Sequence, residues 1–190
     1  DDLLRLLNHL HIQQATLFGY ELGACIAMHF AGLHPDRVDR LVITAYPLFY
    51  PDAVRQKMLT QRLHEIRSQD PALFLRGRLP AITSRGDDDH LWDAYQKVSL
   101  YTYESIIQLI KSSDLSKDYH RNVKPVLYLT GELDDHYPPH LVYHALQIYP
   151  SPILVQVPGA KNLVHIDHPE YTAKRITAFI KTCSQPSSPW

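Results

Sequence analysis

Apolar residues follow two different spacings along the chain. Leucines recur every three or four positions near the start, which predicts an amphipathic helix over residues 1–11. Continuous apolar runs instead predict strands that are buried on both faces, at residues 15–18, 41–44, 123–130 and 153–157. Helical spacing occupies the stretches between and after these runs, at residues 22–33, 53–67, 90–112, 139–149 and 169–182.

The order of these elements predicts a parallel α/β sheet. The stretch between the second and third strands is too long for an ordinary connection, and its pattern is helical but interrupted by a loop around residues 83–89. We expect it to form a helical cap over the carboxyl ends of the strands, where open α/β sheets place their sites. The predicted division is a core over residues 1–46, a cap insertion over 47–122, a second core segment over 123–183 and a disordered tail over 184–190.

Composition excludes several classes of protein. With 190 residues, of which 45% are hydrophobic, the chain is long enough for a sizeable core. The net charge of -1 leaves no basic surplus for nucleic acid or an anionic membrane. No apolar run reaches the roughly 18–20 residues of a membrane span, and the start lacks the character of a signal peptide. Cys25 and Cys183 follow no metal or disulfide spacing, so we expect free thiols and a cytoplasmic protein without a cofactor.

A motif follows the first predicted strand, in which the chain reads Gly19-Tyr20-Glu21-Leu22-Gly23. This is the frame of the nucleophile elbow, G-x-S-x-G, a sharp turn between a buried strand and a helix. We expect both glycines to be required, because the central residue is strained and the neighbouring chain leaves no room for a Cβ atom. The nucleophile position, however, carries a carboxylate in place of the serine hydroxyl.

Three segments together resemble the α/β-hydrolase superfamily over nearly the whole chain. They are the elbow with the following residues 34–43, the segment Lys124-Pro125-Val126-Leu127-Tyr128-Leu129-Thr130-Gly131-Glu132-Leu133-Asp134, and the segment from Val157 to Glu170. The resemblance implies an α/β-hydrolase fold with a helical cap. It places Glu21 at the nucleophile position, Asp134 at that of the triad acid and Asn162 at that of the general-base histidine. It also assigns the oxyanion-hole amide to Leu22.

The resemblance further implies a sheet that lacks the N-terminal strands. In this family the elbow strand is roughly the fifth of eight, whereas this chain opens on the helix just before it. The open side of such a strand is an edge prone to association. We therefore expect either a fragment of a longer protein or a chain that pairs with another polypeptide, or a copy of itself, to complete the sheet.

Two of the three triad positions are replaced, which favours loss of catalysis. On this interpretation Glu21 is tolerated at the elbow, paired with a lysine or arginine, and the site persists as a ligand-binding or scaffolding pseudoenzyme. Its ligand would be a small apolar molecule. General-base assistance contributes about 10²–10⁴-fold to a rate, and Asn162 has no basic nitrogen to supply it.

Two catalytic alternatives remain. In the first alternative Glu21 is the nucleophile, as aspartate is in related dehalogenases and epoxide hydrolases. This mechanism needs a base, such as His165, to activate the water that hydrolyses the ester intermediate. The resemblance argues against His165, because many active members carry a second histidine there. In the second alternative Glu21 acts as a base in isomerase or lyase chemistry. Burial and the nearby charge of Asp134 would raise the pKa of Glu21, and Asn162 would donate a hydrogen bond to a developing oxyanion.

Several histidines and acidic residues lie close together in the sequence and are candidates for metal ligands. His136, His140 and His144 lie near one another in sequence, but no further ligand completes a zinc set, so we expect solvated side chains and no metal. The pair His165 and His168 receives the same interpretation, and residues 87–89 lack the spacing of a calcium loop. The tyrosines around the cap either line a pocket or belong to the core: Tyr46, Tyr50, Tyr95, Tyr101 and Tyr103.

Overall fold

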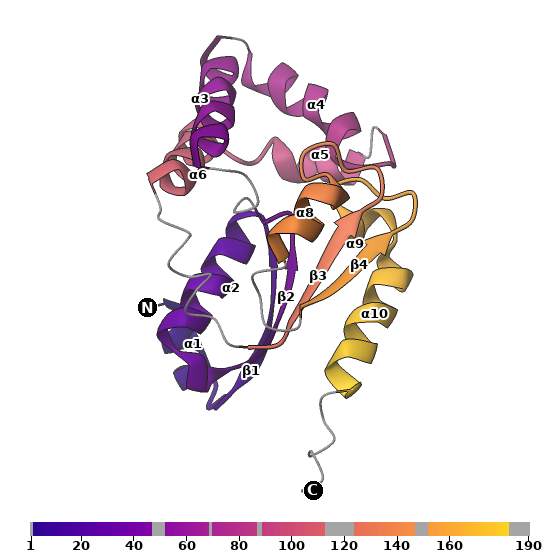
Figure 1. Cartoon of the computed structure of the whole chain (residues 1–190). Coiled ribbons are helices and arrows are strands. Elements are labelled where there is room, and N and C mark those ends of the chain that lie inside the picture. The colour runs from indigo at the N-terminus through magenta and orange to yellow at the C-terminus, as the bar shows by residue number, and fades with distance from the viewer. Residues whose placement is uncertain are drawn as a thin grey trace, which may run out of the picture.

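The centre of the molecule is a parallel four-stranded sheet (Figure 1). The computed structural model describes residues 2–46, 52–68, 70–86, 89–112, 124–146 and 152–182. The strands are β1 (Ala15–Tyr20), β2 (Val38–Thr44), β3 (Val126–Gly131) and β4 (Ile153–Val157), which lie side by side in chain order. All three pairings are parallel, so the predicted sheet and its four strands are confirmed.

Helices cover both faces of the sheet. Helices α1 (Asp2–His9), α2 (Leu22–Leu33) and α8 (Pro139–Leu146) share one apolar cluster with the strands. Helix α10 (Pro169–Thr182) packs on the opposite face through Phe179. A short 3₁₀ turn (Pro35–Arg37) leads into β2, and α9 (Val164–Asp167) precedes α10. The predicted helices over residues 22–33 and 169–182 are confirmed, whereas residues 147–149 of the predicted helix 139–149 lie outside the described residues.

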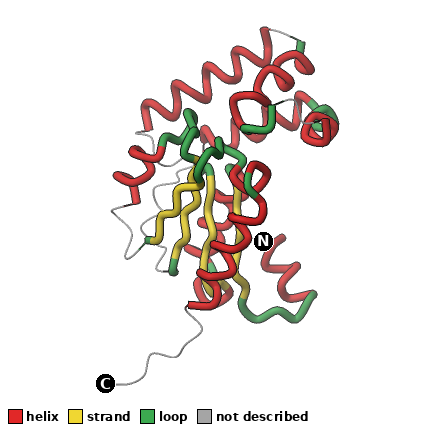
Figure 2. The backbone as a smooth tube through the Cα atoms, turned by 90° about the vertical axis from the view of Figure 1, so that its right-hand side faces the viewer, coloured by secondary structure: helices red, strands yellow, loops and turns green. Residues whose placement is uncertain are grey.

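Between β2 and β3 the chain forms a separate group of helices, called the inserted helices below. They are α3 (Asp52–Ser68), α4 (Pro71–Ile82), α5 (Asp89–Tyr95) and α6 (Leu100–Ser112). Figures 1 and 2 show them gathered at the end of the sheet where the strands finish. Their own cluster is formed by Leu59, Leu63, Ile66, Phe74, Ile107 and Ile110, and Leu22 of α2 packs against it. The inserted helices therefore rest directly on the start of α2.

One predicted helix in this group is wrong. Residues 90–112 form two helices, α5 and α6, with a break over residues 96–99. The cause is a new helix start, because the hydroxyl of Ser99 accepts a 3.0 Å hydrogen bond from the backbone N–H of Thr102. Helix α4 occupies most of the sequence between α3 and α5, where the sequence analysis predicts no helix.

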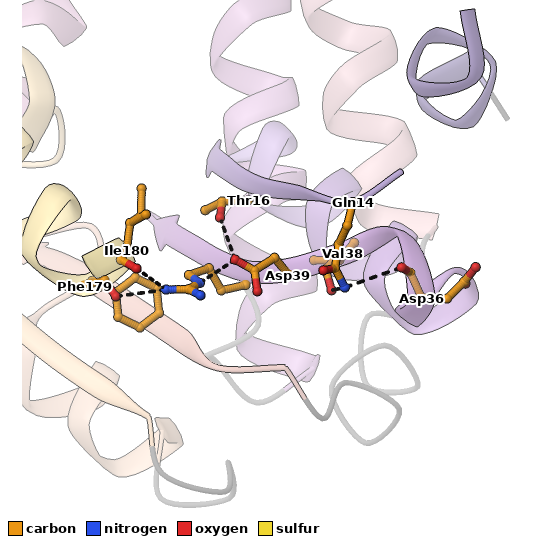
Figure 3. A network of polar contacts seen from close by, with 8 residues as sticks. Gln14, Thr16, Asp36, Val38, Asp39, Phe179 and Ile180 are labelled. Atoms are coloured by element: carbon orange, nitrogen blue, oxygen red, sulfur yellow. Dashed lines mark hydrogen bonds and ion pairs between the residues drawn. The ribbon is translucent and has the colours of Figure 1, made fainter. Parts of the chain in front are cut away.

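A buried arginine connects the sheet to the last helix. Figure 3 labels residues on both sides of this connection, Asp39 of β2 and Phe179 and Ile180 of α10. Arg40 of β2 donates to the carbonyl oxygens of Phe179 and Ile180 at 3.1 and 2.6 Å, near the C-terminal end of α10. Its Nε lies 2.7 Å from a carboxylate oxygen of Asp39, which also accepts a hydrogen bond from Thr16 of β1. Carbonyls at the end of a helix lack helical partners, so this cation satisfies groups that the helix leaves open.

The tyrosines flanking and inside the insertion divide between core and surface. Tyr46 is buried, and Tyr103 packs edge-on against Phe74 inside the helical cluster. Tyr101 is 80% exposed. Tyr50 lies outside the described residues, as does the side chain of Tyr95.

The outer side of β1 is the edge of the sheet in the part of the chain that the structure describes. This agrees with the predicted absence of the N-terminal strands. Phe18 of this strand is among the exposed large apolar side chains. A partner that completes the sheet stays a prediction, as does the division into core and cap segments. Cys183, residues 87–88 and the tail over 184–190 lie outside the described residues. No described helix is both long enough and apolar enough to cross a membrane.

Candidate functional site

The turn between β1 and α2 has the backbone of a nucleophile elbow. Glu21 adopts φ 44° and ψ −110°, a conformation that L residues rarely adopt, and its N–H donates to the carbonyl of Thr44 at 3.2 Å. A Cβ atom on Gly19 would lie 2.5 Å from the carbonyl oxygen of Gly23, so only glycine fits there. The same expectation for Gly23 is wrong: a Cβ atom there meets nothing within 4 Å, because this position of α2 faces open space.

The carboxylate of Glu21 does not cap the helix that follows it. Its side chain makes no capping hydrogen bond to α2. Its electrostatic partner is Arg62 of α3. Burial lowers the pKa of Arg62, but the charge of Glu21, followed by smaller effects of three tyrosines, outweighs burial and leaves the pKa raised. The described ion pairs include none with Glu21, so its expected pairing with a lysine or arginine stays a prediction.

Asn162 is held at both ends of its carboxamide. Its Nδ2 donates a 3.1 Å hydrogen bond to Oδ2 of Asp134, and its Oδ1 accepts a 2.6 Å hydrogen bond from the hydroxyl of Tyr20. Asn162 and Asp134 are 1% and 4% exposed. The structure therefore brings the predicted acid and the predicted base position into contact. The outer end of Asn162 meets Tyr20, and the described hydrogen bonds include none between Asn162 and Glu21.

Asp134 is a buried carboxylate that accepts several hydrogen bonds from the protein. Burial raises its pKa, although hydrogen bonds from the backbone N–H groups of Tyr137 and His136 and from Asn162 act in the opposite direction. The backbone donors lie 3.0 and 2.9 Å from Oδ1. A Cβ atom on Gly131 would overlap with the carbonyl oxygens of Ala160 and Lys161. Glycine at the end of β3 thus permits the close approach that brings Asp134 to Asn162.

The loop that carries Asn162 is fastened to the end of α4. The carboxylate of Asp167 accepts hydrogen bonds from the hydroxyl of Thr83 and from the backbone N–H groups of Ser84 and Lys161. The N–H of Leu163 donates to the carbonyl of Ile82 at 2.8 Å. These contacts hold the inserted helices and the Asn162 loop in one arrangement.

His165 packs as an aromatic ring. Its edge meets Phe18 and Tyr20, with ring centroids 5.7 and 5.4 Å apart. Burial lowers the pKa of His165, and its buried Nδ1 has no hydrogen-bond partner among the described residues. No described hydrogen bond connects it to Glu21 or Asn162, so its service as a substitute base stays a prediction.

A second polar contact lies beside Asp134. Arg78 of α4 approaches His136 with Nη2 3.3 Å from Nε2. Because a guanidinium only donates, Nε2 of His136 accepts and its proton resides on Nδ1. Burial, with the charges of Arg78 and Arg62, lowers the pKa of His136 to about 4, so this histidine is neutral at neutral pH.

Sequence reasoning missed Tyr20, Arg62 and Arg78. The only available signal for Tyr20 is its place beside the elbow residue, on a strand whose end faces the site. The two arginines reach the site only through the packing of α3 and α4, which no local pattern reveals. Leu22 takes the expected place as the first residue of α2, where a helix leaves backbone N–H groups without helical partners.

The described residues contain no group of three or more His, Cys, Asp or Glu side chains that could hold a metal ion. His140 is exposed, as is His168. The side chain of His144 lies outside the described residues.

Comparison with known proteins agrees with this geometry. A family model described as the α/β hydrolase fold matches residues 1–63. The 2-(acetamidomethylene)succinate hydrolase of Mesorhizobium japonicum is 28% identical, over 95% of this chain and 69% of that protein. A bromoperoxidase from Bacillus anthracis superimposes with a TM-score of 0.82 at 18% identity, covering 95% of this chain and 72% of the other. An esterase from Exiguobacterium antarcticum reaches the same TM-score at 16% identity, covering 95% and 71%.

Proposed function

Because the chain has the α/β-hydrolase fold, we propose that it is a pseudoenzyme, which binds a small molecule between the core and the inserted helices without hydrolysing esters. The observation that carries this proposal is the carboxamide of Asn162, whose two ends are occupied by Asp134 and Tyr20. On this proposal the inserted helices are the cap over the site.

Hydrolysis in this fold requires a base next to the nucleophile. The serine mechanism uses a histidine to remove the hydroxyl proton, and an acid to orient the imidazole. Here the acid Asp134 orients an amide, which has no basic nitrogen. An ester formed on Glu21 would therefore persist, because the amide that Asp134 orients cannot activate water. The expected loss of general-base assistance is about 10²–10⁴-fold.

Glu21 is consistent with a binding role. The charge of Glu21 acts on Arg62, a half-buried guanidinium on α3, although the two groups form no ion pair within 4.0 Å. Burial of a cation without a counter-charge is costly. On the proposed function Glu21 therefore offsets part of the charge of Arg62 and takes no part in catalysis.

The second candidate is catalysis by Glu21, and the elbow backbone favours it. Glu21 keeps the strained φ of 44°, and strain of this kind typically costs about 1–3 kcal/mol and clusters at functional sites. The names of two similar proteins are those of a hydrolase and an esterase. In this candidate Glu21 attacks a substrate as nucleophile or removes a proton from it, with Tyr20 as the nearest hydroxyl donor on the motif.

The experiment compares four proteins with a serine-directed phosphonate probe and with activated esters. They are the wild type, Glu21→Ser, Asn162→His and the double variant. The pseudoenzyme predicts no labelling and no turnover above background in the wild type and in both single variants. It predicts labelling and turnover in the double variant, in which the serine and its base are present together. Saturable ester turnover by the wild type would contradict it.

A further inference from the structure

Two arginines of the inserted helices lie beside the site without an ion pair. Arg62 of α3 and Arg78 of α4, called the arginine pair below, are both partly buried. In the described part of the chain, no carboxylate oxygen lies within 4.0 Å of either guanidinium. The contrast is Arg67, whose Nε lies 2.9 Å from Glu104. A guanidinium that loses part of its hydration gains from a counter-charge, so an anionic ligand would stabilise the arginine pair.

Arg78 has donors to spare. Among the described residues its guanidinium has one hydrogen bond, to Nε2 of His136 at 3.3 Å, and lies 5.7 Å from the ring centroid of Phe74. A guanidinium carries five N–H donors in a planar fork. The neutral His136 therefore orients Arg78 without neutralising it, and Phe74 supports its flat face. A guanidinium fixed in this way is prepared for a planar anion.

The arginine pair is connected to the elbow site by a short series of contacts. The backbone N–H of His136 donates to Asp134 at 2.9 Å, and Asp134 accepts from Asn162, which meets Tyr20. Arg62 is influenced by the charge of Glu21 and by Tyr20. A molecule bound at the arginine pair would thus lie next to the elbow.

The nearby carboxylates do not satisfy the arginine pair. Asp134 already accepts two backbone N–H groups and the amide of Asn162. Glu21 offsets the charge of Arg62 from beyond 4.0 Å. Among the described contacts Arg78 has no carboxylate partner. Its positive charge is therefore less compensated than that of Arg62.

We propose that Arg62 and Arg78 bind the carboxylate groups of a small organic acid, and that a dicarboxylate fits them best. Arg78 takes one carboxylate in the two-pronged geometry that guanidinium and carboxylate share, and Arg62 takes the other. This inference rests on the proposed ligand-binding function and replaces the apolar ligand expected from the sequence with an anionic one.

Isothermal titration tests the inference with succinate, and with succinamide as the uncharged analogue of the same shape. The wild type should bind succinate saturably and succinamide at least about tenfold more weakly. Arg78→Gln and Arg62→Gln should each weaken succinate binding by about tenfold or more. The matched control is Arg76→Gln on the same helix, whose guanidinium lies over the ring of Trp92, and it should bind like the wild type.

Equal affinity for succinate and succinamide, or equal loss in Arg76→Gln and Arg78→Gln, would overturn the inference. Absence of succinate binding by the wild type would overturn it as well. If Arg78→Gln does not fold, Arg78→Lys replaces it in the experiment. This variant keeps the positive charge but lacks the planar guanidinium, so it should also bind succinate more weakly than the wild type. Ester turnover measured on the same samples separates the two proposals: turnover contradicts the pseudoenzyme, whereas the charge dependence of binding concerns the arginine pair alone.

Discussion

The hydroxyl of Tyr20 donates a 2.6 Å hydrogen bond to the carboxamide oxygen of Asn162, a residue 142 positions later in the chain. The other end of the same carboxamide donates to Asp134. The three side chains therefore form one series of hydrogen bonds, in which each group uses its natural role as donor or acceptor. The carboxamide of Asn162 is thus held by a specific partner on the elbow strand.

Tyr20→Phe should lower the free energy of unfolding by about 1–3 kcal/mol, because it leaves the buried oxygen of Asn162 without its donor. Urea unfolding followed by circular dichroism measures the change. The control is Tyr101→Phe, a tyrosine that is 80% exposed on the inserted helices, with an expected change within about 0.5 kcal/mol. Equal effects of the two variants would show that the hydrogen bond to Asn162 contributes nothing.

The two elbow glycines should respond in opposite ways to alanine. Gly19→Ala places a Cβ atom 2.5 Å from the backbone of Gly23, which has to move, so we expect a loss of at least about 2 kcal/mol. Gly23→Ala places its Cβ atom in open space within α2 and should be neutral or stabilise by up to about 1 kcal/mol, since alanine favours the helix. Thermal unfolding of both variants gives the comparison. A larger loss in Gly23→Ala than in Gly19→Ala would contradict the described elbow.

His136 should make the protein less stable in mild acid. Its pKa is about 4 in the folded state against 6.5 for the free side chain, so the unfolded state binds more protons between these values. The free energy of unfolding should therefore fall as the pH drops from 6.5 towards 4. Asp134, whose pKa is raised by burial, acts in the opposite direction and is unchanged in the comparison.

The variant His136→Gln should reduce this acid slope, which urea unfolding at several pH values measures. The control His140→Gln removes an exposed histidine close by in the chain and should keep the wild-type slope. A slope that His136→Gln leaves unchanged would mean that this histidine is not buried in its neutral form.

Arg40→Met should cost about 1–3 kcal/mol of stability, because the carbonyls of Phe179 and Ile180 lose their charged donor. The control Arg5→Met removes an ion pair of 3.9 Å on the exposed face of α1, which should matter by less than about 1 kcal/mol. Urea unfolding gives both values. An unchanged midpoint for Arg40→Met would contradict a role for this residue in holding α10.

The sheet could be predicted from sequence because its strands appear as continuous apolar runs, although only β2 and β3 are buried along nearly their whole length. The break before α6 could not, because helical spacing continues on both sides of it and Ser99 alone marks the new start. Three motifs of the superfamily were enough to place Asp134 and Asn162 together, as the 3.1 Å contact confirms. Their functional roles stay predictions.

The remainder of the site depends on tertiary packing. Arg62 lies on a helix that the apolar spacing predicts, and Arg78 lies on α4, which it does not predict; for neither residue does the spacing show whether the side chain faces the core. Tyr20 lies within the motif, yet its partner is 142 residues away. Such contacts arise from how the inserted helices and the Asn162 loop pack on the elbow.

The most direct test of the pseudoenzyme is the turnover of an activated acetate ester by the purified wild type and by Glu21→Gln, the variant that keeps the size of the side chain and removes its charge. We predict that both proteins hydrolyse the ester at the same rate, equal to that of buffer with an unrelated protein. Saturable turnover by the wild type that Glu21→Gln abolishes would contradict the account and establish Glu21 as a catalytic residue.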